Sequence, residues 1–305
     1  MQPRGSTRAT LAHAWAAAAC AACALPAASQ VAQPTLDKIA AANAIEIGYR
    51  ESALPFSYVD DHGDVIGFSQ DICNKVIEAV RARTNRPRLR VRFVPVTAQN
   101  RFPLVQNGAV DIECGVTSNQ KARRSEVAFS YTFFIATTRL LVRKNAGIRD
   151  FSDLAGKTVV TNRGATSERI LRAMNMRQPM RMKILSAKGD EQGRAMLESG
   201  RADAYMNDDV LLQGVRLRTA HPDEWVVTGA PQSLELYGLV MRNGDPAFLR
   251  LVDDVLGGLM KRGEIDAMYT KWFEQPVPPN GVDLRFPMTS QLRALYAKPS
   301  DESGE

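Results

Sequence analysis

The sequence predicts an α/β protein built from two similar lobes. Segments that alternate between apolar and polar residues, as strands do, take turns with segments of helical spacing, which indicates crossover units around a mostly parallel sheet. A leucine, a glycine and an aspartate recur in the same order at 104–112 and at 197–204. Both stretches are predicted to form a helix, a glycine cap and then a strand. The length of 305 residues is sufficient for about two domains.

The first 29 residues are predicted to be a secretory signal peptide. Arg4 and Arg8 precede an Ala-rich apolar run that reaches small residues at 27–29. The alternative of a membrane helix is disfavoured, because the run from Ala14 to Leu25 is shorter than the roughly 20 apolar residues that a bilayer requires. Loss of the two arginines would lower the formal net charge from +6 to +4.

Two of the four cysteines, Cys20 and Cys23, lie inside this segment, so their spacing predicts neither a zinc site nor a redox site. A lipoprotein cleavage site at either one is the weaker alternative, because Ala or Cys stands before each where Leu is usual. Cys73, on a predicted helix, and Cys114, on a predicted strand, either pair in an oxidising compartment or remain two buried thiols.

The next part of the chain reads as strands and helices in alternation. Turn residues at 61–63 predict a hairpin, and Ser69 or Asp71 is the expected cap of the helix that follows. Its apolar positions between 72 and 80 fall on one helical face. The expected elements are a helix at 36–42, a strand at 45–49, the hairpin at 58–65, the helix from 67, a strand at 89–96, a helix at 101–107 and a strand at 110–116.

The second part repeats this alternation from residue 140 onwards. A proline-rich segment at 276–279 is incompatible with regular helix or a central strand. The expected elements are a strand at 140–143, a short helix at 150–156, a strand at 158–161, a helix at 167–174, a helix at 210–216, a strand at 238–242 and helices at 247–262 and 265–273.

Motifs for cofactor, metal and nucleophile chemistry are absent from the sequence. Beyond the leader the only histidines are His62 and His221, and neither has the spacing of a zinc ligand pair. No G-x-S-x-G, Walker A or G-x-G-x-x-G motif occurs. The basic runs at 81–92 and 121–124 lack the interleaved aromatic residues that stack on bases. We therefore expect no cofactor, no metal and no nucleic-acid partner.

Polar side chains collect where predicted strands end and helices begin. Ligands bind at the carboxyl ends of strands in open α/β sheets, so these positions are candidate contacts, although each is also explained by a surface role or a helix cap. Two arginine groups suggest two carboxylate sites, and an aspartate suits a cationic amine. The set fits a zwitterion with an extra acid group: Arg50, Arg101, Thr117, Ser118, Arg123, Thr166 and Asp208.

Ordered segments along nearly the whole chain after the leader match one known family. They include Gly48-Tyr-Arg50-Glu-Ser52, Pro55-Phe-Ser-Tyr58, Glu113-Cys-Gly115, Leu197-Glu-Ser-Gly200 and Lys271-Trp-Phe273. Through these segments the chain resembles the periplasmic amino-acid-binding proteins of ABC importers, and most closely their glutamate/aspartate branch.

The resemblance implies the type II periplasmic binding protein fold, in which two Rossmann-like lobes are joined by two hinge crossovers and close around a ligand like a Venus flytrap. Lobe 1 would comprise residues 30–137 and 238–275, lobe 2 residues 138–237, and a tail at 276–305 would pack on the lobes. It also implies a monomer in the periplasm and an ABC permease–ATPase complex as partner.

The resemblance assigns roles to the candidate contacts. Thr117, Ser118 and Arg123 match the positions for the α-carboxylate, Asp208 the one for the α-ammonium, and Arg50 with Arg101 those for a side-chain carboxylate. Departures bear on specificity. Ala98, Val116 and Ala165 replace hydroxyl residues. Asp190 replaces a histidine and is expected to repel a second carboxylate or to neutralise an arginine.

The leading hypothesis is therefore a binding protein that delivers an acidic amino acid to a permease. An alternative is an enzyme of the same fold, a lyase similar to cyclohexadienyl or arogenate dehydratases, which requires a general acid such as Glu113 or Asp190. A sensor module is a third reading, but no kinase or transmembrane segment follows Phe273.

Overall fold

The computed structural model describes residues 33–177, 180–279 and 281–304, and the expected signal peptide at 1–29 lies outside these ranges. The helices are α1 (Thr35–Ala42), α2 (Phe68–Thr84), α3 (Arg101–Gln106), α4 (Thr166–Arg177), α5 (Asp190–Glu198), α6 (Asp209–Leu217), α7 (Pro246–Lys261), α8 (Glu264–Phe273) and α9 (Ser290–Ala297), with 3₁₀ turns η1 (Lys121–Ser125), η2 (Phe151–Leu154) and η3 (Pro222–Glu224). The strands are β1 (Ala44–Tyr49), β2 (Ser52–Ala53), β3 (Ser57–Val59), β4 (Val65–Ile66), β5 (Arg90–Pro95), β6 (Ile112–Ser118), β7 (Val127–Phe129), β8 (Phe134–Arg143), β9 (Thr158–Asn162), β10 (Lys183–Ala187), β11 (Ala204–Asp208), β12 (Trp225–Thr228) and β13 (Leu234–Arg242).

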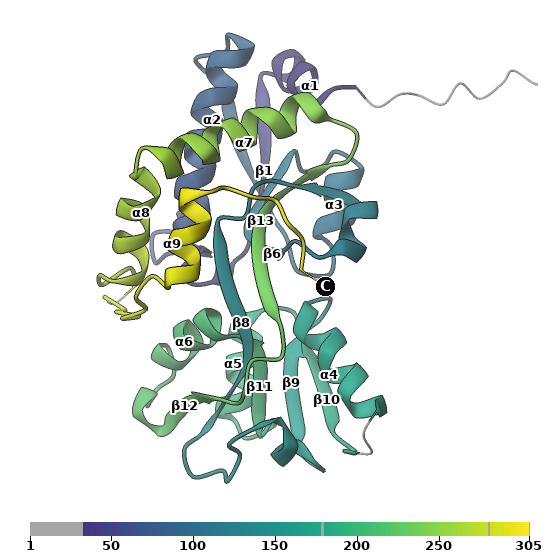
Figure 1. The fold of residues 1–305 in the computed structure, drawn as a ribbon, viewed down its shortest axis with the longest axis vertical. Helices are drawn as coiled ribbons and strands as arrows, with labels where there is room; N and C mark the ends of the chain where they lie inside the picture. Colours follow the sequence, from purple (N-terminus) through teal and green to yellow (C-terminus); the bar gives the residue numbers. More distant parts are fainter. Residues whose placement is uncertain (1–32, 178–179, 280, 305) are drawn as a thin grey trace, which may run out of the picture. The chain divides into compact units, whose positions relative to one another are not determined.

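Two long antiparallel strands join the two halves of the fold. The strand order is β10-β9-β11-β8-β13-β6-β1-β5, with parallel pairing at β5-β1-β6 and at β10-β9-β11. β8 pairs with β13 through residues 134–137 and with β11 through residues 138–142. Figure 1 shows β8 and β13 running side by side between the two groups of strands. These are the two expected crossovers, and the predicted fold class is confirmed.

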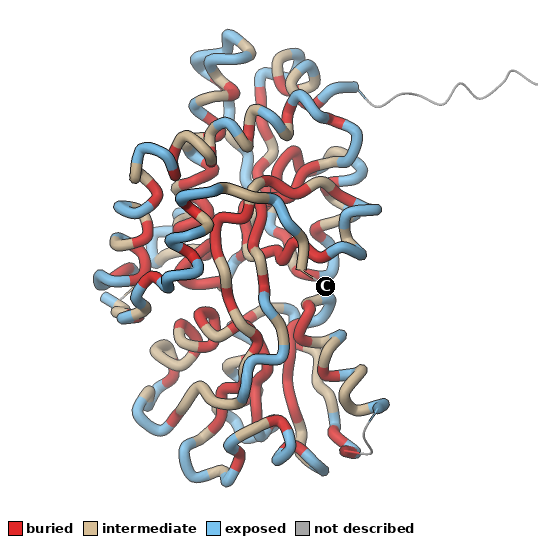
Figure 2. The backbone as a smooth tube through the Cα atoms, in the orientation of Figure 1, coloured by how far each residue is buried: buried red, intermediate tan, exposed pale blue. Residues whose placement is uncertain are grey.

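Each half has its own core. We call the half with β1, β5 and β6 lobe 1 and the half with β9 to β12 lobe 2; the boundaries expected near residues 137 and 237 remain predictions. Neighbouring residues such as Leu140 and Leu141 on β8, or Tyr205 and Met206 on β11, enter different apolar clusters because strand side chains alternate between faces. Figure 2 shows this burial along the central strands.

The internal echo is confirmed by matching local geometry. Gly108 after α3 has φ +77° and Gly200 after α5 has φ +72°, the left-handed conformation that favours glycine at a helix end. Asp111 Oδ2 then accepts a hydrogen bond from the backbone N–H of Glu46 at 2.9 Å, and Asp203 Oδ2 accepts one from Thr158 at 2.8 Å. In both lobes the same pattern ties a new strand to its neighbour.

The expected cap of α2 was wrong. The N-cap is Gly67, and no side chain caps the helix. The Ser69 hydroxyl donates instead to the carbonyl of Gly115 at 2.8 Å, and the Asp71 carboxylate accepts from Lys271 and Trp272 at 2.7 Å each. Both side chains serve contacts with distant parts of the chain, which local sequence does not reveal.

The two remaining cysteines form a disulfide. Cys73 on α2 and Cys114 on β6 are bridged, with their Cα atoms 6.3 Å apart. This settles the alternative left open by the sequence. The bridge fastens α2 to the strand that ends at Thr117 and Ser118.

The C-terminal tail returns to lobe 1. Leu292 and Tyr296 of α9 are buried in the lobe 1 core. Beyond the helix, the backbone N–H of Gly304 donates to the carbonyl of Asn119 and the N–H of Thr132 donates to that of Ser300, both at 2.9 Å. The tail thus contacts the segment directly after Ser118. Across the described ranges, helices fall short of the length and apolar character that a membrane span requires.

Candidate ligand-binding site

A small cavity lies at the carboxyl ends of β1, β6, β9 and β11 and is lined from both lobes. Its empty space is about 380 Å³. Six of the predicted contacts line it: Arg50, Arg101, Ser118, Arg123, Thr166 and Asp208. Thr117 and Asp190 are not among its lining residues. The remaining lining residues are Ala98, Val116, Asn162, Ala165, Ser167, Asn207 and Leu211.

Three arginines dominate the lobe 1 side, and two of them are buried. Arg50 and Arg101 are only 6% and 2% exposed, and no described carboxylate forms an ion pair with them or with Arg123. Arg123 Nη1 donates to the carbonyl of Ser118 at 2.9 Å. The Phe102 ring contacts the guanidinium groups of Arg101 and Arg123, at 4.7 Å and 5.6 Å from its centroid.

These charges destabilise one another. Burial, together with repulsion from Arg123, lowers the pKa of Arg101 well below its usual value. Burial also lowers the pKa of Arg123, with Arg169 adding to the effect. Buried cations without a partner cost several kcal/mol each, so an anionic ligand would be strongly stabilised here.

A buried glutamate lies beneath the arginines. Glu113 on β6 is fully buried, and neither of its carboxylate oxygens has a hydrogen-bond partner in the described part of the chain. Burial raises its pKa, while the charges of Arg101 and Arg50 act against that rise. Gly115 makes room for this arrangement, since a Cβ there would lie 2.0 Å from Glu113 Oε1 and 3.1 Å from Arg50 Cγ.

Asp208 provides the negative charge on the lobe 2 side. It ends β11, and its Oδ2 accepts a hydrogen bond from the Tyr237 hydroxyl. Burial raises its pKa well above the usual value, and Glu235 reinforces this. A ligand ammonium group would offset the cost of ionising this acid.

Hydroxyl groups complete the set. The Oγ1 atoms of Thr117 and Thr166 are buried and lack hydrogen-bond partners among the described residues. Buried hydroxyls are rarely unpaired, so the hydroxyl of Thr166, which lines the cavity, is a candidate ligand contact, whereas Thr117 does not line it. Thr166 begins α4, where the first backbone N–H groups also favour an anion.

Asp190 lies one side chain away from the cavity. Its Oδ1 accepts hydrogen bonds from Asn162 and Asn207, two residues that do line the cavity. Asn162 and Leu211 were missed by the sequence reasoning. Asn162 ends β9, so the strand-end rule that found Arg50 and Asp208 identifies it as well.

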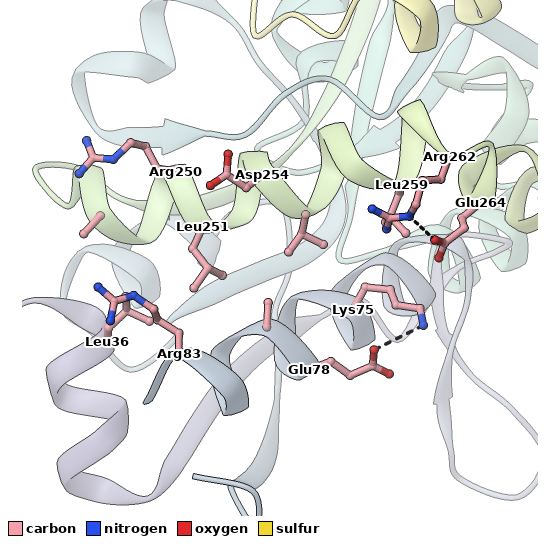
Figure 3. Close-up of a pocket in the computed structure, with 13 residues that line it drawn as sticks. Leu36, Lys75, Glu78, Arg83, Arg250, Leu251, Asp254, Leu259, Arg262 and Glu264 are labelled. Atoms are coloured by element: carbon pink, nitrogen blue, oxygen red, sulfur yellow. Dashed lines mark hydrogen bonds and ion pairs between the residues drawn. The ribbon is translucent and has the colours of Figure 1, made fainter. Parts of the chain in front are cut away.

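A larger hollow lies on the helical face of lobe 1 between α2 and α7, with about 1490 Å³ of empty space (Figure 3). Its charged side chains are partly paired with one another, as in Lys75 Nζ with Glu78 Oε2 at 3.4 Å and Arg262 Nε with Glu264 Oε1 at 2.6 Å. It contains none of the strand-end residues. We therefore assign ligand binding to the smaller cavity.

Comparison with known sequences gives extensive matches. The sequence model of the bacterial extracellular solute-binding proteins, family 3, matches residues 45–275. An L-glutamate/L-aspartate-binding protein of Pseudomonas aeruginosa is 49% identical over 89% of this chain and 90% of its own length. A glutamate/aspartate import solute-binding protein of Escherichia coli is 44% identical over 90% of this chain and 91% of its own.

Solved structures match the fold. An ancestral arginine-binding protein bound to arginine superposes with a TM-score of 0.68 at 25% identity, covering 76% of this chain and 98% of its own. An ancestral amino acid-binding protein described as a precursor of cyclohexadienyl dehydratase gives a TM-score of 0.66 at 29% identity, covering 78% of this chain and 99% of its own.

Proposed function

Because the chain belongs to the family 3 bacterial extracellular solute-binding proteins, we propose that it binds an acidic amino acid of the glutamate/aspartate type and delivers it to an ABC importer. The observation that carries this proposal is a group of three arginines, of which Arg50 and Arg101 are buried, that lines one small cavity together with Asp208. The names of the glutamate/aspartate-binding relatives support it, at 49% and 44% identity.

The charges suggest how the ligand lies. Arg123, beside Ser118, holds the α-carboxylate, and Asp208 holds the α-ammonium. Arg50 and Arg101 hold the second carboxylate. A guanidinium group pairs with a carboxylate through two parallel hydrogen bonds, so each pairing fixes orientation as well as charge. Thr166, which lines the cavity, supplies a hydroxyl hydrogen bond.

Capture works by lobe closure. Lobe 1 supplies the arginines and lobe 2 supplies Asp208 and Thr166, so a ligand contacts the full set only when the lobes meet. The ligand therefore shifts the population towards the closed form, which differs from the open form by rotation about β8 and β13. We infer that an inner-membrane permease recognises this closed form and that the protein works in the periplasm as a monomer.

Binding rather than catalysis is the role that we infer. The dehydratase alternative requires a general acid at the ligand, for which the sequence offered Glu113 or Asp190. Neither residue lines the cavity, and Glu113 lies beneath Arg50 and Arg101. The relatives from Pseudomonas aeruginosa and Escherichia coli are named for binding and import.

Calorimetry on protein freed of ligand by unfolding and refolding tests this proposal. We expect L-glutamate and L-aspartate to bind at one site per chain and L-arginine, whose side chain is cationic, to give no heat. Failure of both acids to bind at millimolar concentration would refute the proposal. Turnover of a prephenate-like acid would favour the enzyme instead.

A further inference from the structure

A buried hydrogen-bonded cluster lies behind the lobe 2 wall of the cavity. We call it the Asp190 cluster, and it consists of Asn162, Asp190, Tyr205 and Asn207. Asp190 Oδ1 accepts hydrogen bonds from Asn162 Nδ2 at 2.5 Å, from the Tyr205 hydroxyl at 2.8 Å and from Asn207 Nδ2 at 3.0 Å. All four residues are buried, and three secondary-structure elements contribute them.

Packing fixes the members of this cluster in place. Asp190 is the first residue of α5, while Tyr205 and Asn207 lie two apart on β11 and so share one face of the sheet. A Cβ at Gly193, one turn further along α5, would lie 2.6 Å from Tyr205 Cζ. Glycine at 193 therefore gives the phenol ring the space to reach Asp190.

The carboxylate determines which way Asn207 turns. An ionised carboxylate only accepts hydrogen bonds, so the amide must direct its NH₂ group towards Asp190. The Tyr205 hydroxyl lies on the same side, 3.3 Å from Asn207 Nδ2. With the NH₂ group turned towards Asp190, we infer that Asn207 offers its Oδ1 to the cavity that it lines.

The Asp190 cluster lies on the side of the cavity near Arg50. A Cβ at Gly189, next to Asp190, would lie 3.2 Å from the hydroxyl of Ser52, two residues after Arg50. Burial and the neighbouring Asp190 raise the pKa of Tyr205 well above its usual value, and Arg50 is close enough to act against this rise. The ligand's far end, held by Arg50, thus faces an acceptor and a buried negative charge on the opposite wall.

We propose that the Asp190 cluster extends the ligand range of this cavity from the acids to the amide amino acids, glutamine and asparagine. This inference rests on the proposed function. A carboxamide accepts from an arginine through its C=O and donates to Asn207 Oδ1 through its NH₂. A carboxylate has no hydrogen to donate there, and it is repelled by Asp190.

The test compares Kd values for L-glutamate and L-glutamine by calorimetry. In the wild type we expect both to bind. Asp190→Asn removes the charge at nearly constant shape and frees Asn207 to turn, so we expect the ratio Kd(glutamine)/Kd(glutamate) to rise about tenfold. Asn207→Ala removes the acceptor and should raise Kd for glutamine more than for glutamate. Asp203→Asn, at a matching acid that accepts from Thr158 outside the site, should leave the ratio unchanged.

The outcomes separate this inference from the proposed function. If glutamate and aspartate bind but glutamine gives no heat at millimolar concentration, only the inference is wrong. It is also wrong if Asp190→Asn and Asn207→Ala leave the ratio at the wild-type value, or if Asp203→Asn shifts it equally. If neither acid binds, the proposed function is wrong. If Asp190→Asn does not fold, the ratio of Kd values measured for Asn207→Ala still tests the inference.

Discussion

At the scale of single residues, we expect the strength of binding to depend on arginines that the protein buries without ion-pair partners among its described residues. Arg101 is the extreme case, since its Nε is also without a hydrogen-bond acceptor in that part of the chain. Such a residue is unfavourable for folding alone and favourable once an anion arrives. The protein therefore gives up some stability for affinity at this position.

Replacing Arg101 by Met should lower the affinity for the ligand without lowering the stability of the ligand-free protein. We expect Kd for glutamate to rise at least about 100-fold, because a buried charge-assisted pair is lost, while the free energy of unfolding without ligand stays equal or increases. Calorimetry and urea unfolding measure the two effects. Arg172→Met is the control, since Arg172 is half-exposed and paired with Glu168 at 2.8 Å outside the cavity. Equal losses of affinity in both variants would contradict the assignment.

The pH dependence of binding should report Asp208. Burial and Glu235 raise the pKa of this carboxyl, so it takes up a proton at higher pH than an exposed aspartate. A ligand ammonium requires the ionised form, and glutamate affinity should therefore fall as the pH decreases through the raised pKa. Titrations from about pH 8 to about pH 5 measure this.

Asp208→Asn should bind more weakly and with a shallower pH profile. Glu113 remains in the variant and provides the background pH dependence, since burial also raises the pKa of its carboxyl group. An identical pH profile in wild type and variant would show that another group controls the binding.

Sequence reasoning located most of the cavity but not the Asp190 cluster. The strand-end rule needs only the local pattern, and it found Arg50, Ser118 and Asp208. Asp190, on α5, is hydrogen-bonded to Asn162 on β9 and to Asn207 on β11, which line the cavity. The absence of a side chain at Gly193 leaves space for the ring of Tyr205. Such an arrangement depends on tertiary packing, and neither periodicity nor spacing along the chain encodes it.

At the scale of elements, local patterns predicted well wherever one face is buried. The helix face of α2 follows directly from burial against one core. Local patterns did not predict where β8 and β13 begin, because these crossing strands change their neighbours midway along their length. Helix α9 was not predicted, since its burial through Leu292 and Tyr296 is set by the lobe that it covers.

The tail after α9 should support the anion-binding segment. The backbone N–H of Gly304 donates to the carbonyl of Asn119, and Arg124 donates to the carbonyl and the carboxylate of Asp301. These two contacts flank the stretch that contains Arg123. Ending the chain at Lys298 should therefore raise Kd for glutamate about three- to tenfold through a looser 118–124 segment. Calorimetry measures this. Asp283→Ala, which changes the tail before α9, should leave Kd unchanged, and an unaffected truncated protein would contradict the role.

At the scale of the whole molecule, the account requires the two lobes to approach closely. Gly164, in the loop before α4, has φ +78°, and a Cβ there would lie 2.9 Å from the carbonyl oxygen of Ala98 in lobe 1. Arg169 of lobe 2 also donates to Gln120 Oε1 of lobe 1 at 3.2 Å. Glycine at 164 thus permits the contact between the lobes.

Gly164→Ala should therefore impair closure. We expect Kd for glutamate to rise about tenfold or more, because the added methyl group meets backbone atoms of the other lobe. Gly156→Ala is the matched control, since Gly156 has φ +73° and no atom within 4 Å of the added Cβ. Both variants should lose about 1 kcal/mol of unfolding free energy through the left-handed backbone, but only Gly164→Ala should lose affinity. Equal affinities would contradict closure at this contact.

A crystal structure of the protein grown with L-glutamate tests the proposed binding mode most directly. We expect one glutamate in the cavity, with its α-carboxylate on Arg123, its ammonium on Asp208 and its side-chain carboxylate on Arg50 and Arg101. A glutamate bound elsewhere, or one held in this cavity without contact to the arginines, would show that these residues do not form the binding site.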